Sequence, residues 1–290
     1  MTHGNTSRAQ STKRLLLEIG FRNVSVPPTF EWSDIHEVEL VAKGHLSPSL
    51  FTRMRMRKDT DYTGLRRYAA LSMSQVQQLQ AAANNQQALI LIEDDLLPGD
   101  SVLQVRGRLS EILSHAPPDT DMVYLEYCFE SCQDLLYNPA FPHLARAYFP
   151  SCSAAIYFTP QGARKAAHLT YPVWDVIDRM YPDLIHMGWL NAYVTTPPLF
   201  YQDQYFGSNF KRGRTYWNQE LHEQTGNEKV FYHVPAFHTP VCWEVGSRDV
   251  IVSHQLRLLD LRQIGVVVPP HLKAKFITVQ GGGEGEGRWE

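Results

Sequence analysis

Three consecutive carboxylates, Glu93, Asp94 and Asp95, form the part of the sequence best suited to chemistry. They directly follow the apolar run LILI at 89–92, which is typical of a strand buried on both faces. Open α/β sheets bind ligands at the carboxyl ends of strands, and adjacent carboxylates repel each other unless a cation compensates them. Hard oxygen ligands suit Mg²⁺ or Mn²⁺, which usually hold substrate phosphates as well. We therefore expect a cation site here; the alternative is an acidic, solvated turn.

The segments around this motif are expected to alternate between helices and strands. Helical spacing and cap signals predict helices at 11–21, 62–85, 100–114 and 160–168, a short helix within 35–46 and another helix after 175. Apolar runs predict strands at 89–92, 122–127, 145–149 and 153–158, with extended segments at 24–32 and 197–202. The stretch LLPGD at 96–100 carries a turn signal. Together these elements predict an α/β fold with a mostly parallel central sheet.

Composition and charge exclude several classes of protein. The net charge of −3 over 290 residues argues against nucleic-acid binding, which usually leaves a basic excess. No apolar run reaches the ~18 residues needed to span a bilayer, and residues 1–14 lack the apolar core of a secretion signal. We expect a cytoplasmic protein, or one of the secretory-pathway lumen if the sequence is a fragment. The sequence has no glycine-rich phosphate loop, so a bound phosphate would need a metal or basic side chains.

Several short motifs follow the carboxylates in a fixed order. They are YL at 124–125, AAIYFTPQGA at 154–163, PVWD at 172–175, PPLFYQ at 197–202 and then Ser208. This order and spacing resembles glycosyltransferase family 25, the group of lipopolysaccharide-core and collagen galactosyltransferases, over roughly residues 11–210. Two patterns of the family are altered here. Its N-L-x-x-R-x-x-R first strand has no counterpart before the helix at 11–21, and the S-H pair of its G-C-x-x-S-H segment reads Ser72-Met73.

The resemblance implies a GT-A fold, a nucleotide-binding α/β sandwich whose DXD-type acidic motif holds a divalent ion on the diphosphate of a sugar nucleotide. It also implies an inverting, metal-dependent transfer of a hexose or pentose to a hydroxyl of a glycan or glycoprotein, with UDP as the favoured nucleotide. We expect one domain over 1–275, with a nucleotide-sugar half at about 1–125 and an acceptor half at about 126–275. The glycine-rich tail at 276–290 is expected to be disordered.

The same resemblance assigns roles within the acidic motif. Asp95 is the expected metal ligand, Asp94 assists it or contacts the ribose or the donor sugar, and Glu93 completes the motif. The ion, Mn²⁺ or Mg²⁺, would neutralise the diphosphate and stabilise the charge that develops on the leaving UDP. His238 is the candidate for a further metal ligand, since a late histidine completes the Mn²⁺ shell of some GT-A enzymes. The alternative is an imidazole with a backbone partner.

Inversion needs a general base that removes the proton of the acceptor hydroxyl. Asp175 matches the acid of the family's P-V-D pattern and is the first candidate, with a helix N-cap as its alternative role. Glu126, near the end of the strand at 122–127, and Asp178 are the reserve candidates. Gln202 matches the Gln of the family and is a candidate for contacting donor or acceptor, with a loop-backbone partner as its alternative role. Ser208 is a further candidate for such a contact.

A compact basic cluster, KRGR at 211–214, contains Arg212 and follows Ser208 closely. It could close over the diphosphate of the donor, or it could be a solvated loop. Two other function classes stay open as well. A metal-dependent hydrolase would use the acidic motif in a two-metal site but would want further ligands, such as an N-terminal D-x-H or D-x-D pair, which the sequence lacks. A catalytically inactive sugar-binding or scaffold protein would keep the fold, and the two altered family patterns favour it.

Overall fold

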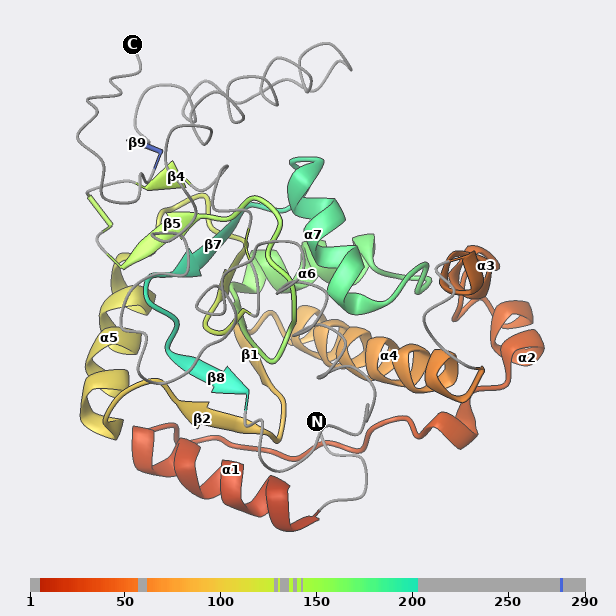
Figure 1. Ribbon diagram of the computed structural model, residues 1–290, viewed down its shortest axis with the longest axis horizontal. Helices are drawn as coiled ribbons and strands as arrows, with labels where there is room; N and C mark the ends of the chain where they lie inside the picture. The colour runs from red at the N-terminus through yellow and green to blue at the C-terminus, as the bar shows by residue number, and fades with distance from the viewer. Residues whose placement is uncertain are drawn as a thin grey trace, which may run out of the picture.

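The computed structural model describes residues 6–56, 62–127, 130, 136–137, 140–141, 143–202 and 277–278, which form an α/β arrangement (Figure 1). The helices are α1 (Thr6–Ile19), η1 (Trp32–Asp34), α2 (Glu37–Ala42), α3 (Ser49–Met56), α4 (Tyr62–Asn84), α5 (Val102–His115), α6 (Pro160–Leu169) and α7 (Ile177–His186). The strands are β1 (Leu89–Ile92), β2 (Leu96–Pro98), β3 (Met122–Tyr124), β4 (Leu136–Tyr137), β5 (Leu144–Arg146), β6 (Ala155–Phe158), β7 (Ala192–Thr195), β8 (Phe200–Gln202) and β9 (Ile277–Thr278). Among the helices within these ranges, none combines the length and the apolar character that crossing a membrane requires.

The main sheet is mixed rather than mostly parallel. Its strands lie in the order β1-β6-β3-β7-β5-β4-β9, and β4 and β9 at one end have two residues each. Of the described neighbours, β3 and β7 pair in parallel and all the others pair antiparallel. A separate antiparallel pair joins β2 to β8. The predicted α/β class is therefore confirmed, and the predicted mostly parallel sheet is wrong.

Strand β6 explains this error. It lies between β1 and β3 and runs antiparallel to both, so that Ile156 is opposite Leu91 on one side and Tyr124 on the other. Helices cover both faces of the sheet, and a strand covered on both faces has the same continuous apolar sequence whichever way it runs. Because β1 and β3 still point in the same direction, their carboxyl ends lie at the same edge of the sheet.

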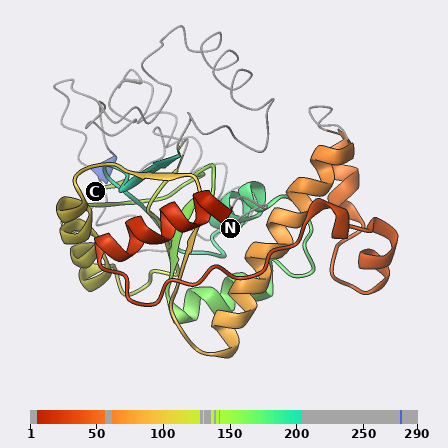
Figure 2. The same cartoon turned by 90° about the horizontal axis from the view of Figure 1, so that it is seen from below.

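Two layers of helices cover the sheet, each around its own apolar core. Helices α4, α6 and α7 pack on one face, around a cluster that includes Leu79 and Leu91. Helices α1 and α5 pack on the other face, around a cluster that includes Ile19 and Val105. Figure 2 shows α1 and α5 on one side of the molecule and α4 on the other. The end of β1 therefore lies between α1 and α4.

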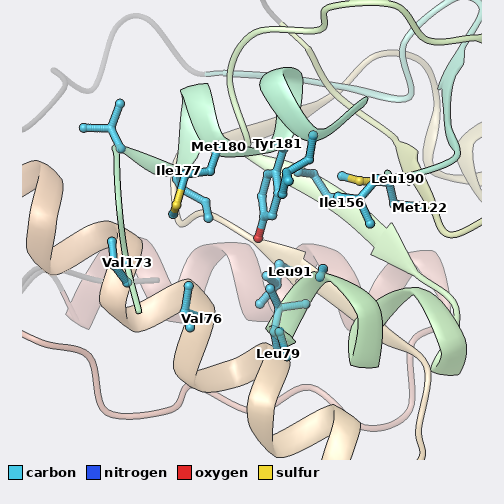
Figure 3. Packing of buried hydrophobic residues seen from close by; sticks show 14 of the residues in the cluster. Val76, Leu79, Leu91, Met122, Ile156, Val173, Ile177, Met180, Tyr181 and Leu190 are labelled. Atoms are coloured by element: carbon cyan, nitrogen blue, oxygen red, sulfur yellow. The ribbon is translucent and has the colours of Figure 1, made fainter. Parts of the chain in front are cut away.

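Helix α7 is fixed to the sheet and to α4 by the first of these cores. Figure 3 shows Tyr181 of α7 extending toward Leu91 of β1 and Leu79 of α4. Tyr181, Leu79 and the neighbouring Ile156 have no exposed surface. Full burial of a large apolar side chain stabilises a fold by ~1.5–3 kcal/mol, so these contacts hold α7 against the sheet and α4.

Local sequence signals located most of the helices. Helix α4 covers 62–84, as its spacing predicted. Helices α5 and α6 begin at capping residues: the Ser101 hydroxyl accepts the N–H of Gln104, and the Thr159 hydroxyl accepts that of Gly162. Helix α3 and strand β7 were not predicted. Residues 96–98 form β2 instead of part of a turn, and Pro98 is tolerated because it lies at the end of the strand.

The amino end of β3 is held by Asp121, at the opposite end of the sheet from the acidic motif. Its Oδ2 accepts hydrogen bonds from Lys165 Nζ at 2.6 Å and from the N–H of Asn191 at 2.8 Å. Helix α6 approaches this point closely, since a Cβ atom on Gly162 would lie 1.8 Å from the Asp121 carbonyl oxygen. Glycine is therefore required at position 162 by a close backbone approach rather than by a turn.

Candidate functional site

The acidic motif lies in the turn between β1 and β2, at the carboxyl end of β1, where the sequence placed it. Two hydrogen bonds hold its backbone. The Glu93 N–H donates to the Ala154 carbonyl at 2.7 Å, and the Thr12 hydroxyl of α1 donates to the Asp94 carbonyl at 2.9 Å. The turn is thus fixed between the end of the sheet and α1, which limits the directions available to its carboxylates.

Arg8 of α1 neutralises part of the motif. Its Nη2 lies 2.7 Å from Asp94 Oδ1 and 3.4 Å from Asp95 Oδ2, and the three side chains are 12% exposed or less. The other two oxygens, Asp94 Oδ2 and Asp95 Oδ1, are buried without a hydrogen-bond partner among the described residues. Burial raises the pKa of Asp95 even though the Arg8 charge opposes this shift. The arginine therefore compensates the motif only in part.

Two further acids join the motif from other elements. Glu126 follows β3 and is fully buried, and Asp178 lies in the first turn of α7. Burial, and then the charges of Asp95 and Asp178, raise the pKa of Glu93 to about 8. Burial, and then the charges of Glu93, Asp95 and Asp178, hold the pKa of Glu126 well above its usual range. We call Glu93, Asp94, Asp95, Glu126 and Asp178 the acidic cluster.

A polar chain from α4 and α7 supports Asp178. Gln75 Nε2 donates to Ser153 Oγ at 3.0 Å, and Gln75 Oε1 accepts from the Tyr181 hydroxyl at 3.3 Å. The pKa of Asp178 is raised by burial and lowered by its hydrogen bond with Ser153. Its Oδ1 is buried without a hydrogen-bond partner among the described residues. Gln75 and Ser153 were not predicted as site residues; the signal for Gln75 is an amide on the apolar face of a helix.

Asp175, the first candidate for the base, lies just before α7. It is fully buried, and its Oδ1 accepts the N–H of Val176, the N-cap residue of α7, at 2.7 Å. The Ser72 hydroxyl accepts the next N–H, that of Ile177, at 2.9 Å. Asp175 and Ser72 thus hold the start of α7. The charge that acts on Glu93 and Glu126 from this region is that of Asp178, and a catalytic role for Asp175 stays a prediction.

Of the remaining predicted residues, Gln202 lies beside the acidic motif, since its partner Leu96 directly follows Asp95, and the others lie outside the described residues. Gln202 ends β8 and is opposite Leu96 of β2. Ser208, Arg212 and His238 lie outside the described residues, so their contacts with donor, phosphate or metal stay predictions.

The described residues fit a cation that is held by two carboxylates. In this part of the chain, no group of three or more His, Cys, Asp or Glu side chains is arranged to hold a metal ion. Mg²⁺ usually needs only one or two carboxylates, because substrate phosphates and water supply its other ligands. The unpartnered oxygens of Asp94 and Asp95 have the chemistry for this arrangement.

A cavity of about 650 Å³ extends from the acidic motif along β1. We call it the β1 slot. Residues 87–94, from the approach to β1 to Asp94, line it together with residues 23–27. Helix α1 covers the slot with residues that include Ala9 and Leu16, and Gln78 of α4 borders it as well. Glu93 and Asp94 of the acidic motif therefore belong to the lining of a cavity beside β1.

Comparison with known proteins does not identify the chain: no protein-family model matches it, and no curated protein matches it either.

Proposed function

We propose that this protein is a metal-dependent glycosyltransferase of GT-A architecture that moves a hexose or pentose from a nucleotide sugar to a hydroxyl of a glycan or glycoprotein. The observation that carries the proposal is the convergence of the acidic cluster at the carboxyl ends of β1 and β3. Buried carboxylates that raise each other's pKa are unfavourable together, and a cation offsets their repulsion. The resemblance to glycosyltransferase family 25 supports the same assignment, with inversion and UDP as its corollaries.

Each end of the motif has a proposed role. Asp94 and Asp95 would hold Mn²⁺ or Mg²⁺, and the ion, when bound, supplies charge stabilisation to a diphosphate leaving group. Arg8 lies 2.7 Å from Asp94, close enough for its guanidinium to contact a phosphate at the same place. Glu93, with a pKa of about 8, is protonated at neutral pH without a cation and can then donate a hydrogen bond to a ribose or sugar hydroxyl.

Asp178 is the best-placed general base for the acceptor hydroxyl. Its side chain keeps some exposure, whereas Glu126 and Asp175 are fully buried and cannot meet a substrate without rearrangement. Burial raises the pKa of Asp178, which makes it a stronger base than an ordinary carboxylate. Ser153 restrains its side chain, and the buried Oδ1 has no hydrogen-bond partner among the described residues, so it would accept the acceptor proton once the substrate reaches it.

Donor binding and turnover test this function directly. UDP with Mn²⁺ should raise the melting temperature, and a chelator should abolish the rise, because the diphosphate is held through the ion. Turnover should then be measured with UDP-galactose, UDP-glucose, UDP-xylose and GDP sugars. Asp95→Ala should abolish turnover, because it removes the proposed metal ligand.

A matched control is Asp34→Asn, which removes an exposed carboxylate from the short helix η1 and should leave turnover unchanged. If Asp95→Ala kept wild-type turnover, the assignment of the metal ligand would be wrong. If no donor stabilised the protein or was turned over, the glycosyltransferase proposal would fail.

A second candidate is a catalytically inactive sugar-binding or scaffold protein of the same fold. The Arg8 ion pairs favour it, because an arginine already supplies positive charge to Asp94 and Asp95. Arg8→Gln separates the two candidates. If the protein is an enzyme and the cation displaces Arg8, wild type should bind Mn²⁺ and Arg8→Gln should bind it more tightly. If the protein is inactive and Arg8 has taken the place of the cation, wild type should not bind Mn²⁺.

A further inference from the structure

A second cavity, of about 350 Å³, lies at the surface where the last turn of α4 meets the end of α6. We call it the α4–α6 pocket. Its lining combines two alanines with four side chains that can form hydrogen bonds, and consists of Gln80, Ala83, Asn84, Ala167, His168 and Tyr171. None of these residues lines the β1 slot or belongs to the acidic cluster. The pocket is therefore separate from the candidate site, and its volume falls within the range of roughly 300–1,000 Å³ that is usual for ligand pockets.

Three of the lining side chains carry hydrogen-bonding groups that the protein itself does not use. Within the described part of the chain, no hydrogen bond joins the side chain of Gln80, Asn84 or His168 to another residue. Amides and a neutral imidazole can each donate and accept hydrogen bonds. Gln80 and Asn84 are four residues apart on α4, so their amides lie on the same face of the helix. A ligand in the pocket would therefore meet several polar groups at once.

Tyr171 adds an aromatic ring whose orientation is fixed. The residue is 38% exposed, and its hydroxyl lies 2.7 Å from His45 Nδ1. The backbone on either side of this contact is joined as well: the Val173 N–H donates to the His45 carbonyl at 3.1 Å, and the Ser47 N–H donates to the Val173 carbonyl at 2.8 Å. A ring held in this way loses little conformational freedom when a ligand covers it. Tyr171 can therefore serve as a platform on which a ligand stacks.

The chemistry of the lining selects the kind of ligand. Among the described lining residues there is no Asp, Glu, Lys or Arg, so a charged ligand would find no opposite charge in the pocket. Amide and imidazole groups suit a ligand with several hydroxyls, because each hydroxyl both donates and accepts. The exposed face of Tyr171 suits a ligand that also has a flat apolar side. A pyranose ring combines these properties, since it has hydroxyls around its rim and C–H groups on its faces.

We propose that the α4–α6 pocket binds a neutral sugar ring, which stacks on Tyr171 and forms hydrogen bonds with the side chains of Gln80, Asn84 and His168. It is a glycan-binding site distinct from the acidic cluster, and it needs no metal ion. The proposal goes beyond the transferase activity, because such a site would hold the protein on a glycan whether or not the chain transfers a sugar.

Titration of the full chain with simple sugars tests this site. The probes are the methyl glycosides of galactose, glucose, mannose and xylose, and binding is measured by NMR. At least one of them should bind saturably, and a chelator should leave its affinity unchanged, because the described lining holds no carboxylate. The control ligand is sorbitol, a linear polyol that offers hydroxyls but no ring face to stack. Sorbitol should bind about tenfold more weakly than the best glycoside.

Two adjacent asparagines provide matched protein variants. Asn84 lines the pocket, so Asn84→Ala should weaken binding of the best glycoside about fivefold. Asn85 is also exposed but does not line the pocket, so Asn85→Ala should bind the glycoside as wild type does. Tyr171→Ala should weaken binding about tenfold, because it removes the stacking face. A further readout needs no variant: the bound sugar should shift the side-chain amide signals of Gln80 and Asn84 and leave those of Asn85 in place.

Several results would overturn the proposal. These are no binding of any of the four glycosides, equal binding of sorbitol, or wild-type affinity in a folded Asn84→Ala variant. Binding that a chelator abolishes would place the sugar at the acidic cluster instead of the α4–α6 pocket. The outcome for the transferase is separate: a glycoside that binds here, in a chain that turns over no nucleotide sugar, would support this site while the transferase proposal fails.

Discussion

Replacing Glu93 by Gln should remove much of the pH dependence that the acidic cluster imposes on stability. Glu93 has a pKa of about 8 in the folded protein, against an ordinary value of 4.5, chiefly because burial disfavours its ionised form. Its neighbours Asp95 and Asp178 add to this effect by repulsion. Gln keeps the size of the side chain and cannot ionise, so the variant isolates the cost of the charge.

The sign and size of the effect follow from the two pKa values. Below pH 4.5 the carboxyl is protonated in both the folded and the unfolded chain, and it does not bias unfolding. Between 4.5 and 8 the unfolded chain loses a proton that the folded chain keeps, so stability falls as the pH rises. Above 8 the penalty is constant. At ~1.4 kcal/mol per pH unit, it reaches at most about 5 kcal/mol.

Urea unfolding at about pH 5 and about pH 9 measures this difference. Wild type should lose several kcal/mol between the two conditions; Glu93→Gln should lose less, with Glu126 still contributing, and should exceed wild type at the higher pH. Saturating Mn²⁺ should reduce the loss in wild type, because a bound cation favours the ionised carboxylate. The control Glu18→Gln changes an exposed glutamate of α1 and should keep the wild-type dependence. Equal slopes for wild type and Glu93→Gln would refute the reasoning.

Four further substitutions have expected outcomes. Arg8→Gln should destabilise the protein by about 3 kcal/mol in thermal melts without added metal, because it leaves nearly buried carboxylates without their partner; a loss below about 1 kcal/mol would contradict a structural ion pair. Gly162→Ala should cost about 3 kcal/mol, since its Cβ would lie 1.8 Å from the Asp121 carbonyl oxygen. Gly107→Ala, whose Cβ meets nothing within 4 Å, should instead stabilise α5 by up to about 1 kcal/mol. Asp178→Asn should lower kcat about 100-fold or more with little change in KM for the donor, and an unchanged kcat would exclude it as the base.

Helix positions were predictable because their signals are local. The spacing of apolar residues in 62–84 and the Thr159-Pro160 start of α6 each lie within one element. Strand direction was not predictable. A strand covered by helices on both faces needs a continuous apolar run such as LILI whether it pairs in parallel or antiparallel. Strand β2 was hidden for a different reason. Its partner β8 lies about a hundred residues further along the chain, and Pro98 and Gly99 alone are typical of a turn.

The candidate site was predictable only where one element sufficed. The motif at 93–95 stands out because three acids follow an apolar strand, and Glu126 stands out for a similar reason. Arg8 and Asp94 are 86 residues apart in the sequence, and no local sequence pattern predicts such an ion pair. The choice between Asp175 and Asp178 depends on which side of the first turn of α7 faces the cluster. That orientation is set by the packing of Tyr181, which the sequence alone does not reveal.

The intervening position of β6 has a consequence for how the protein folds. Strands β1 and β3 do not touch each other, and β6 follows both of them in the chain. The carboxylates that follow β1 and β3 can thus stay apart during folding until β6 pairs with both strands and brings their ends together. Their mutual repulsion then falls on this late, long-range step, which is slow in any case because distant segments must meet. Alkaline conditions should slow that step, because they ionise the carboxylates. A divalent ion should speed it, so the proposed cation would assist folding as well as substrate binding.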